Sequence, residues 1–417
     1  MANIKSYIIG DFVKQGKAEI KTGPFGTQLH ASDYVETGTP VINVRNIGYG
    51  TIKEDKLEFI SDETVQRLSS HLLKPGDIVF GRKGAVDRHV FITEEFGDWF
   101  QGSDCIRLRF NSNEVDSRFV SYSLLSNQHK QWMFNQCSHG ATMASLNQDI
   151  VSRVPINLPS INAQKKIVSI LATYDDLIET NTRRIKILEE MAQSIYRQWF
   201  INFRFPGHEK FRMVESELGM IPEGWNIEKI GNTCRIIMGQ SPKSEFYNED
   251  GKGLPFHQGV ANFGVHFPND KIYCTAVTRE AESDDILFSV RAPVGRINIA
   301  DKHIGIGRGL SSIRSKNDQQ LFVLFQLKDK FQLEDSIGNG AIFNSVTKDD
   351  VFNLKMIQPS AEIALRFCKI VEPMWKEIKL FTASNKCLSQ SRDLLLPRLI
   401  LGELNIEELN IKVPFED

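Results

Sequence analysis

The chain has 417 residues and a nearly balanced charge, with 50 Lys and Arg against 52 Asp and Glu for a net charge of −2. This length suffices for two or three domains, and no run approaches the ~20 apolar residues that a membrane span needs. A protein that holds nucleic acid unaided is usually more basic, so the balance indicates that a partner shares any neutralisation of phosphates. Without a signal-peptide pattern or a CxxC pair, the sequence predicts a cytoplasmic protein with reduced thiols and no membrane association.

Residues 1–158 are predicted to form a mixed α/β domain. Short apolar runs at 41–44, 77–80 and 105–108 indicate strands, because turn signals such as Gly23-Pro24 and Pro75-Gly76 separate them. A helical stretch is expected from about Asp116 to Phe134, followed by a turn at 138–140. The turns at 145–147 and 345–347 are interpreted as caps of the structure that follows them.

Residues 159–205 are predicted to form one long helix of a coiled coil. From Ile167 to Trp199, apolar residues recur in alternating steps of four and three, and Asn181 is the one polar residue at these positions. This spacing is typical of the seam between two paired helices.

Residues 206–358 repeat the plan of the first domain. The segment GDIVFGRKGAVDR at 76–88 parallels DDILFSVRAPVGR at 284–296, and 140–150 parallels 340–350 at a spacing of 200. A repeat of this size indicates a duplicated domain rather than a solenoid.

The seam pattern returns at 359–402, ahead of a C-terminal tail at 403–417. It runs from Phe367 to Leu399, with Asn385 and Arg392 as polar positions. Pro373 is expected to break this helix or to start its regular part, and Pro397 to kink or end it.

Asn181 and Asn385 predict the direction and register of the helix pair. If the two amides face each other in an antiparallel pair, Ile167 faces Leu399 and Trp199 faces Phe367. A parallel pair would place Asn181 beside a phenylalanine, which costs ~1–3 kcal/mol because the buried amide loses its hydrogen bonds. An antiparallel coiled coil is therefore expected.

Six segments follow one another along the chain in a characteristic order: 23–29 (GPFGTQL), 41–46 (VINVRN), 74–79 (KPGDIV), 159–167 (PSINAQKKI), 221–225 (IPEGW) and 392–399 (RDLLLPRL). This order of motifs resembles the specificity subunit of Type I restriction-modification systems. The resemblance implies an α+β fold, in which two target recognition domains in a pseudo-twofold arrangement are separated by the two helices.

The resemblance also implies a non-catalytic role. Each domain would read one half of an asymmetric bipartite site in double-stranded DNA, and the helices would set the gap and dock two modification subunits. Two restriction subunits would complete the complex. This chain would bind no cofactor or metal, whereas its partners would use S-adenosylmethionine, ATP and Mg.

Candidate base-reading residues are polar side chains on Gly-containing loops, because Arg, Lys, Asn and Gln form paired hydrogen bonds with base edges. Arg45 and Lys83 are the strongest of these. The set is Thr27, Gln28, Asn43, Arg45, Asn46, Arg82, Lys83, Arg88, Gln240, Ser241, Lys243, His257, Gln258, Arg291, Arg296 and Arg308.

No set of catalytic residues stands out in the sequence. It has no Pro-Pro pair for a methyltransferase base pocket, no GxxxxGK[ST] loop and no HExxH motif. The glycines at 303–309 are interpreted as a strand and turn rather than a nucleotide loop. Two alternatives stay open: a stand-alone DNA nuclease or modification enzyme with Asp11, Glu19 and Lys21 at a metal site, and a coiled-coil adaptor that binds only protein.

Overall fold

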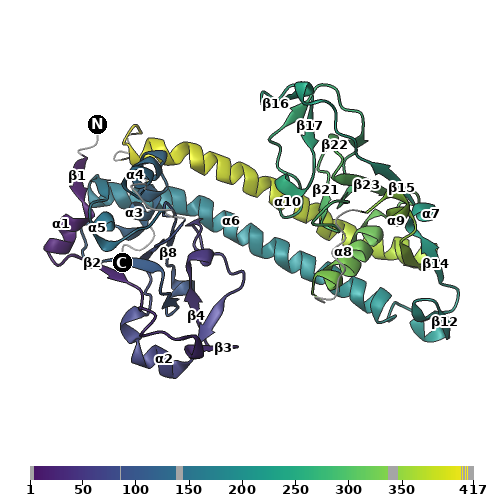
Figure 1. Ribbon diagram of the computed structural model, residues 1–417, viewed down its shortest axis with the longest axis horizontal. Helices are drawn as coiled ribbons and strands as arrows, with labels where there is room; N and C mark the ends of the chain where they lie inside the picture. The colour runs from purple at the N-terminus through teal and green to yellow at the C-terminus, as the bar shows by residue number, and fades with distance from the viewer. Residues whose placement is uncertain are drawn as a thin grey trace. The chain divides into compact units, whose positions relative to one another are not determined.

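The computed structural model describes residues 4–84, 86–137, 144–336, 346–404, 406, 409 and 411. The chain divides into two compact units (Figure 1): unit 1 is Met1–Thr180 with Ser384–Asp417, and unit 2 is Asn181–Ala383. Within the described ranges, every helix is too short or too polar to cross a membrane. The turn expected at 138–140 and residues 140–143 and 340–345 of the predicted repeat lie outside these ranges.

Unit 1 begins as an alternation of short strands and helices. Its elements are β1 (Lys5–Ile8), α1 (Ile9–Lys14), β2 (Ala18–Thr22), β3 (Tyr34–Val35), β4 (Thr39–Ile42), β5 (Tyr49–Gly50), β6 (Glu58–Ile60), α2 (Asp62–Arg67), β7 (Ile78–Gly81), β8 (His89–Phe91), β9 (Phe100–Gln101), β10 (Cys105–Phe110), α3 (Ser117–Leu124), α4 (Asn127–Cys137), α5 (Gln148–Ser152) and β11 (Pro155–Leu158). The strands expected at 77–80 and 105–108 are confirmed as β7 and β10. Of the run at 41–44, only 41–42 belong to a strand, β4, because a 3-10 helical turn begins at Val44.

Three sheets organise these strands. Their orders are β2-β10-β7-β8-β5, β3-β6-β4-β9 and β1-β11. The helical stretch expected from about Asp116 to Phe134 is confirmed, and it consists of two helices, α3 and α4. Asp116 caps α3 by accepting hydrogen bonds from the next backbone N–H groups, and the chain tightens at Leu125, whose N–H bonds the Tyr122 carbonyl at 3.1 Å.

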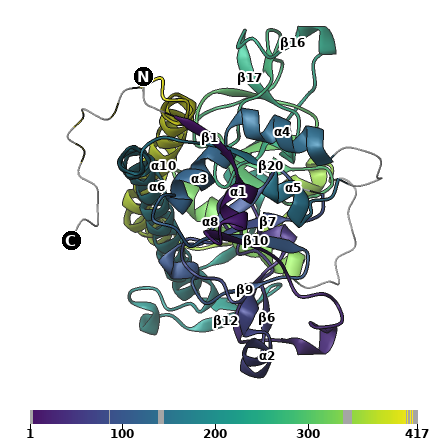
Figure 2. The same cartoon turned by 90° about the vertical axis from the view of Figure 1, so that its left-hand side faces the viewer.

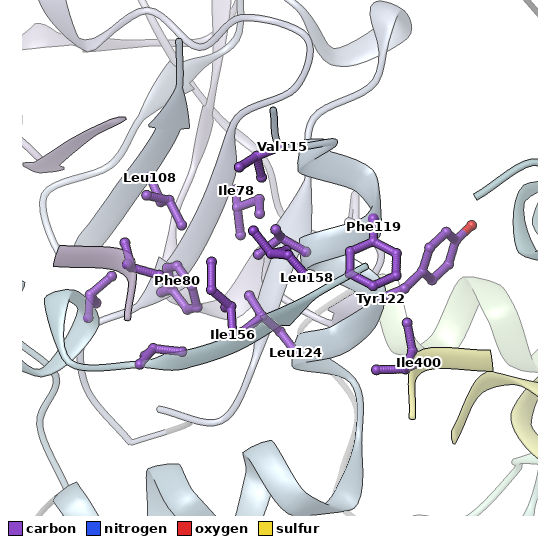
Figure 3. Close-up of a cluster of buried hydrophobic side chains, with 14 of the residues drawn as sticks. Ile78, Phe80, Leu108, Val115, Phe119, Tyr122, Leu124, Ile156, Leu158 and Ile400 are labelled. Carbon is purple, nitrogen blue, oxygen red and sulfur yellow. The ribbon is translucent and has the colours of Figure 1, made fainter. Parts of the chain in front are cut away.

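The main core of unit 1 joins the strands, α3 and the ends of the two long helices. Figure 3 shows Ile156 of β11 and Leu124 of α3 within one cluster that also reaches Ile400. Phe119 is fully buried there. The apolar positions of three distant chain segments therefore meet in a single core.

Unit 2 contains the second run of strands and helices. Its elements are β12 (Met213–Ser216), β13 (Gly219–Pro222), β14 (Asn226–Lys229), α7 (Ile230–Thr233), β15 (Cys234–Met238), β16 (Tyr247–Asn248), β17 (Leu254–His257), β18 (Tyr273–Cys274), β19 (Glu280–Ala281), β20 (Ile286–Ser289), β21 (Ile297–Ile299), β22 (Ile304–Ile306), β23 (Leu310–Ser315), α8 (Gln320–Ser336), α9 (Lys348–Phe352) and β24 (Lys355–Gln358).

Strand pairing confirms the repeat that the sequence predicts. The order β15-β23-β20-β21 in unit 2 matches β2-β10-β7-β8 in unit 1, and β16-β18-β17-β22 matches β3-β6-β4-β9. The registers agree as well: Gly81 faces Cys105 in unit 1, as Ser289 faces Leu310 in unit 2. The strand and turn expected at 303–309 are confirmed as β22 and the start of the turn to β23.

Two long helices contribute to both units. α6 spans Ile161–Tyr196 and continues as a π-helical turn to Ile201, and α10 spans Ala361–Ile400. Unit 1 contains the start of α6 and the end of α10, which lie side by side in Figure 2. There Arg392 pairs with Asp175 at 2.6 Å.

Unit 2 contains the other two ends, the end of α6 and the start of α10. The Trp199 and Phe367 rings lie 6.2 Å apart between their centroids, as the predicted register requires. Since the first part of one helix packs on the last part of the other in each unit, the antiparallel pairing is confirmed.

The break expected at Pro373 is wrong, because α10 continues through it. A proline inside a helix costs ~3 kcal/mol. Val371 and Trp375, on either side of Pro373, are both buried in the core of unit 2. This burial keeps the segment around the proline helical. Pro397 lies in the last turn of α10, where the helix ends at Ile400.

Candidate nucleic-acid interface

Three loops of unit 2 meet at one end of its strands. The loop after β15 is tied to β22, since the Gln240 N–H donates to the Ile306 carbonyl at 3.0 Å. The Arg308 N–H donates to the Ser241 hydroxyl at 3.2 Å. The Gly309 N–H donates to the Gln258 carbonyl at 2.9 Å, which joins the loop after β17 to the same group.

Glycines make this close approach possible. A Cβ at Gly239 would lie 2.2 Å from the Gly307 carbonyl oxygen, and one at Gly307 would lie 2.8 Å from the Gln258 Cα. The backbones therefore pack against one another, while the side chains of Gln240, Gln258 and Arg308 are exposed. These types of side chain can bond base edges, so we call this the unit 2 loop surface.

Arg291, Lys243 and Arg296 add positive charge to the loops of unit 2, and all three are exposed. The loop at Arg291 is joined to the loop surface by the preceding residue, since the Val290 N–H donates to the Gly309 carbonyl at 2.9 Å.

His257 differs from the other candidates because it is fully buried. Its Nε2 lies 3.1 Å from the Asp270 carboxylate. Burial lowers the pKa of His257 despite this neighbouring acid. The imidazole therefore supports the loop surface from beneath and does not face outward.

Unit 1 has an equivalent arrangement. The Gly23 N–H donates to the Cys105 carbonyl at 2.9 Å, and the Gly102 N–H donates to the Ile42 carbonyl at 3.0 Å. A Cβ at Gly102 would lie 2.4 Å from the Asn43 side-chain oxygen. With the exposed Thr27 and Gln28, these loops form the unit 1 loop surface.

Acidic residues hold the strongest candidates of unit 1 in place. Glu58 pairs with Arg45 at 2.8 Å and accepts a hydrogen bond from the Asn43 amide at 2.7 Å. Lys83 pairs with Asp104 at 3.2 Å. Arg45 and Lys83 are both about half exposed, so the pairs position cations that face solvent.

Other candidates of unit 1 have roles within the fold. Asn46 is fully buried, and its amide donates to the Lys53 and Asp55 carbonyls. The Arg88 guanidinium lies over the Tyr49 ring, 5.2 Å from its centroid. Arg82 joins neighbouring loops through its backbone, whose N–H donates to the Asp104 carbonyl at 2.8 Å.

Sequence reasoning missed the loop at 102–104. The sequence repeat could have identified this loop as a candidate, because it links β9 and β10 as residues 307–309 link β22 and β23. Ser103 thus occupies the place of Arg308.

The residues proposed for a metal site do not converge. Asp11 accepts a hydrogen bond from the Ile8 N–H at 3.1 Å, and Glu19 pairs with Arg107 at 2.9 Å. In the parts of the chain that the structure describes, no three His, Cys, Asp or Glu residues gather as metal ligands do. The expected caps are present at Asn147 and Thr347, which begin α5 and α9, while Ser345 lies outside the described residues.

The chain is similar to known proteins over most of its length. The model of the Type I restriction modification DNA specificity domain matches residues 8–190. The putative type I restriction enzyme MjaX specificity subunit of Methanocaldococcus jannaschii is 30% identical over 377 residues, covering 89% of this chain and 88% of that protein. The HindI specificity subunit of Haemophilus influenzae is 22% identical over 435 residues, covering 87% and 94%. Among solved structures, the Type-I restriction-modification S subunit from M. genitalium aligns with a TM-score of 0.60 at 16% identity, covering 95% and 96%.

Proposed function

Because the chain belongs to the specificity subunits of type I restriction-modification systems, we propose that its two loop surfaces read the two halves of a bipartite DNA site. The observation that carries the proposal is the convergence of exposed Gln240, Gln258 and Arg308 on glycine-packed loops. Amide and guanidinium groups in such positions bond base edges in the major groove, and glycines let the backbone approach phosphates.

The two half-sites differ in sequence. Matched strand ends place Asn43 where unit 2 has Gln258, and Lys83 where it has Arg291. Side chains of different length and hydrogen-bonding pattern bond different base edges. An asymmetric site follows, with Asn43, Arg45 and Lys83 facing one half and the unit 2 loop surface facing the other.

In this proposal α6 and α10 act as the spacer between the two readers, and Asn181 and Asn385 maintain its register. The helices dock two modification subunits that use S-adenosylmethionine, and two restriction subunits that use ATP and Mg join them. The chain itself binds no cofactor, and the complex works in the cytoplasm.

The spacer is tested by inserting one heptad into both helices, after Thr180 and after Ala383. Seven residues at 1.5 Å lengthen the spacer by about 10 Å, which is about three base pairs. Sequencing of methylated sites in cells with the modification subunits should show a longer gap and unchanged half-sites. Altered half-sites with an unchanged gap would contradict the spacer.

The two alternatives are separated by simpler measurements on the purified chain. Cleavage or methylation of DNA without partners would favour a stand-alone enzyme. DNA binding that does not weaken with salt, or no binding at all in the assembled complex, would favour the protein-only adaptor.

A further inference from the structure

A buried aspartate pairs with an arginine at the same place in both units. In unit 1, Asp77, just before β7, pairs with Arg109 of β10 at 2.6 Å. In unit 2, Asp285 before β20 pairs with Arg314 of β23, and the Ser312 hydroxyl donates to the same carboxylate at 2.6 Å. The surroundings of the two pairs can therefore be compared position by position.

Unit 1 fills the space beside its pair with an arginine. The Arg107 side chain is only 2% exposed and pairs with Glu19 at 2.9 Å. Its guanidinium also donates to the Ser70 carbonyl at 3.1 Å. Across the strands, Glu19 faces Arg109 directly, and Lys21 faces Arg107. The pair that Glu19 forms therefore has opposite charges.

Unit 2 changes both of these positions. The strand registers place Ser312 where unit 1 has Arg107, and Arg235 where unit 1 has Glu19. Arg235 faces Arg314 directly across the strands. Like charges in such a position are destabilising.

Because the Ser312 side chain is smaller than that of Arg107, a pocket of about 350 Å³ remains on this face of unit 2. Its residues are Arg235, Ile237, Thr278, Arg279, Glu280, Glu282, Asp285, Ser312 and Arg314. Every one of them belongs to unit 2.

The acids of the pocket already have partners. Asp285 is held by Arg314 and Ser312, and Glu280 pairs with His303 at 2.9 Å. Glu282 lies 3.7 Å from the same imidazole. Across the described ranges, no acid forms an ion pair with Arg235 or Arg279, so two guanidinium groups at the pocket are available to a ligand.

We propose that this pocket binds a phosphate group, which the guanidinium groups of Arg235 and Arg279 would hold. A phosphate supplies the negative charge that Glu19 supplies in unit 1, and it offsets the repulsion between Arg235 and Arg314. Guanidinium groups suit this ligand because two of their N–H groups can bond two phosphate oxygens at once.

The phosphate has two possible sources, the DNA backbone and free phosphate in solution. Arg279 connects the pocket to the unit 2 loop surface, since the Ile306 N–H donates to its carbonyl at 2.9 Å and the Ile306 carbonyl accepts from Gln240. A backbone source therefore rests on the proposed function, whereas binding of free phosphate does not depend on it.

The first experiment uses the full chain with inorganic phosphate and no DNA. Calorimetric titration, with chloride at matched ionic strength as reference, should detect binding to the wild type. Arg279→Gln should weaken it at least roughly tenfold, the loss expected for one charge-assisted hydrogen bond. Arg235→Glu combined with Ser312→Arg, which rebuilds the filled arrangement of unit 1, should abolish it. Lys252→Gln is the matched control, because it removes one exposed charge of unit 2 outside the pocket and the long helices, which pairs with Asp250 at 3.4 Å.

The second experiment measures DNA affinity against salt concentration in the assembled complex. If the pocket binds a backbone phosphate, Arg279→Gln should reduce the magnitude of the slope of log affinity against log salt concentration by about one relative to Lys252→Gln. The preference for each half-site should be unchanged. An unchanged slope together with phosphate binding in the first experiment assigns the pocket to free phosphate. No phosphate binding and equal slopes for the two variants would overturn the proposal. Loss of all DNA binding by the wild-type complex would refute the proposed function and leave the first experiment standing.

Discussion

The ion pair between Asp175 and Arg392 should stabilise the helix seam of unit 1 far more than a surface pair does. The two groups lie 2.6 Å apart, and their side chains are 29% and 22% exposed. Asp175 also accepts the Tyr122 hydroxyl at 2.5 Å, which ties α3 to the seam. Exposed pairs contribute ~0.2–1 kcal/mol, and breaking a buried pair costs ~3–5 kcal/mol. A coupling free energy of about 2 kcal/mol is therefore expected for this half-buried pair.

A double-mutant cycle with Asp175→Ala and Arg392→Ala measures that coupling. Urea unfolding of the full chain gives the free energy of each variant, and Tyr122→Phe separates the contribution of the hydroxyl. The control is the pair of Asp149 and Arg153 in the same unit, which is 74% and 48% exposed and should couple by ~0.3–0.5 kcal/mol. Equal coupling energies for the two pairs would refute the argument from burial.

Three further changes test other parts of the structure. Burial lowers the pKa of His129 to about 4, below an unfolded value of about 6.5. Protonation of His129 thus favours unfolding. Its contribution to the free energy of unfolding should be complete above pH ~6.5 and decrease toward pH ~4. In urea titrations, His129→Gln should lose less free energy of unfolding than the wild type between pH ~6.5 and ~5. Gly307→Ala should change recognition of one half-site, because its Cβ would meet neighbouring backbone, whereas Gly259→Ala has open space and should leave the methylated sequence unaltered. Phe367→Ala should cost ~3–5 kcal/mol in thermal or urea unfolding because Phe367 is fully buried; a loss below ~1 kcal/mol would contradict its place in the core.

Local patterns in the sequence determined the helices and the duplication. The steps of four and three from Ile167 to Trp199 repeat along α6 and into the π-helical turn that follows it. A register follows from two polar positions in apolar seams. Trp199 and Phe367 pack together as that register predicts. The parallel segments at 76–88 and 284–296 likewise predicted matching strands, which pair in the same register.

Tertiary packing alone decided which polar side chains face outward. Asn46 and Gln258 both belong to polar, Gly-containing segments, yet Asn46 is buried in backbone hydrogen bonds and Gln258 is exposed. His257, next to Gln258, is fully buried, with its Nε2 3.1 Å from the Asp270 carboxylate. Residue type and spacing do not distinguish these cases, since each depends on partners distant in the chain.

The same limit applies to Pro373 and to the pocket of unit 2. A proline is unfavourable in an isolated helix, and only the burial of Val371 and Trp375 against the core explains why α10 continues through it. Ser312 is an ordinary strand residue until strand pairing sets it in the place of Arg107. The sequence by itself determined the repeated plan and the antiparallel helices, because those depend on periodic local patterns. Only the tertiary structure decided which charges are satisfied and which face solvent, because that depends on contacts between segments far apart in the chain.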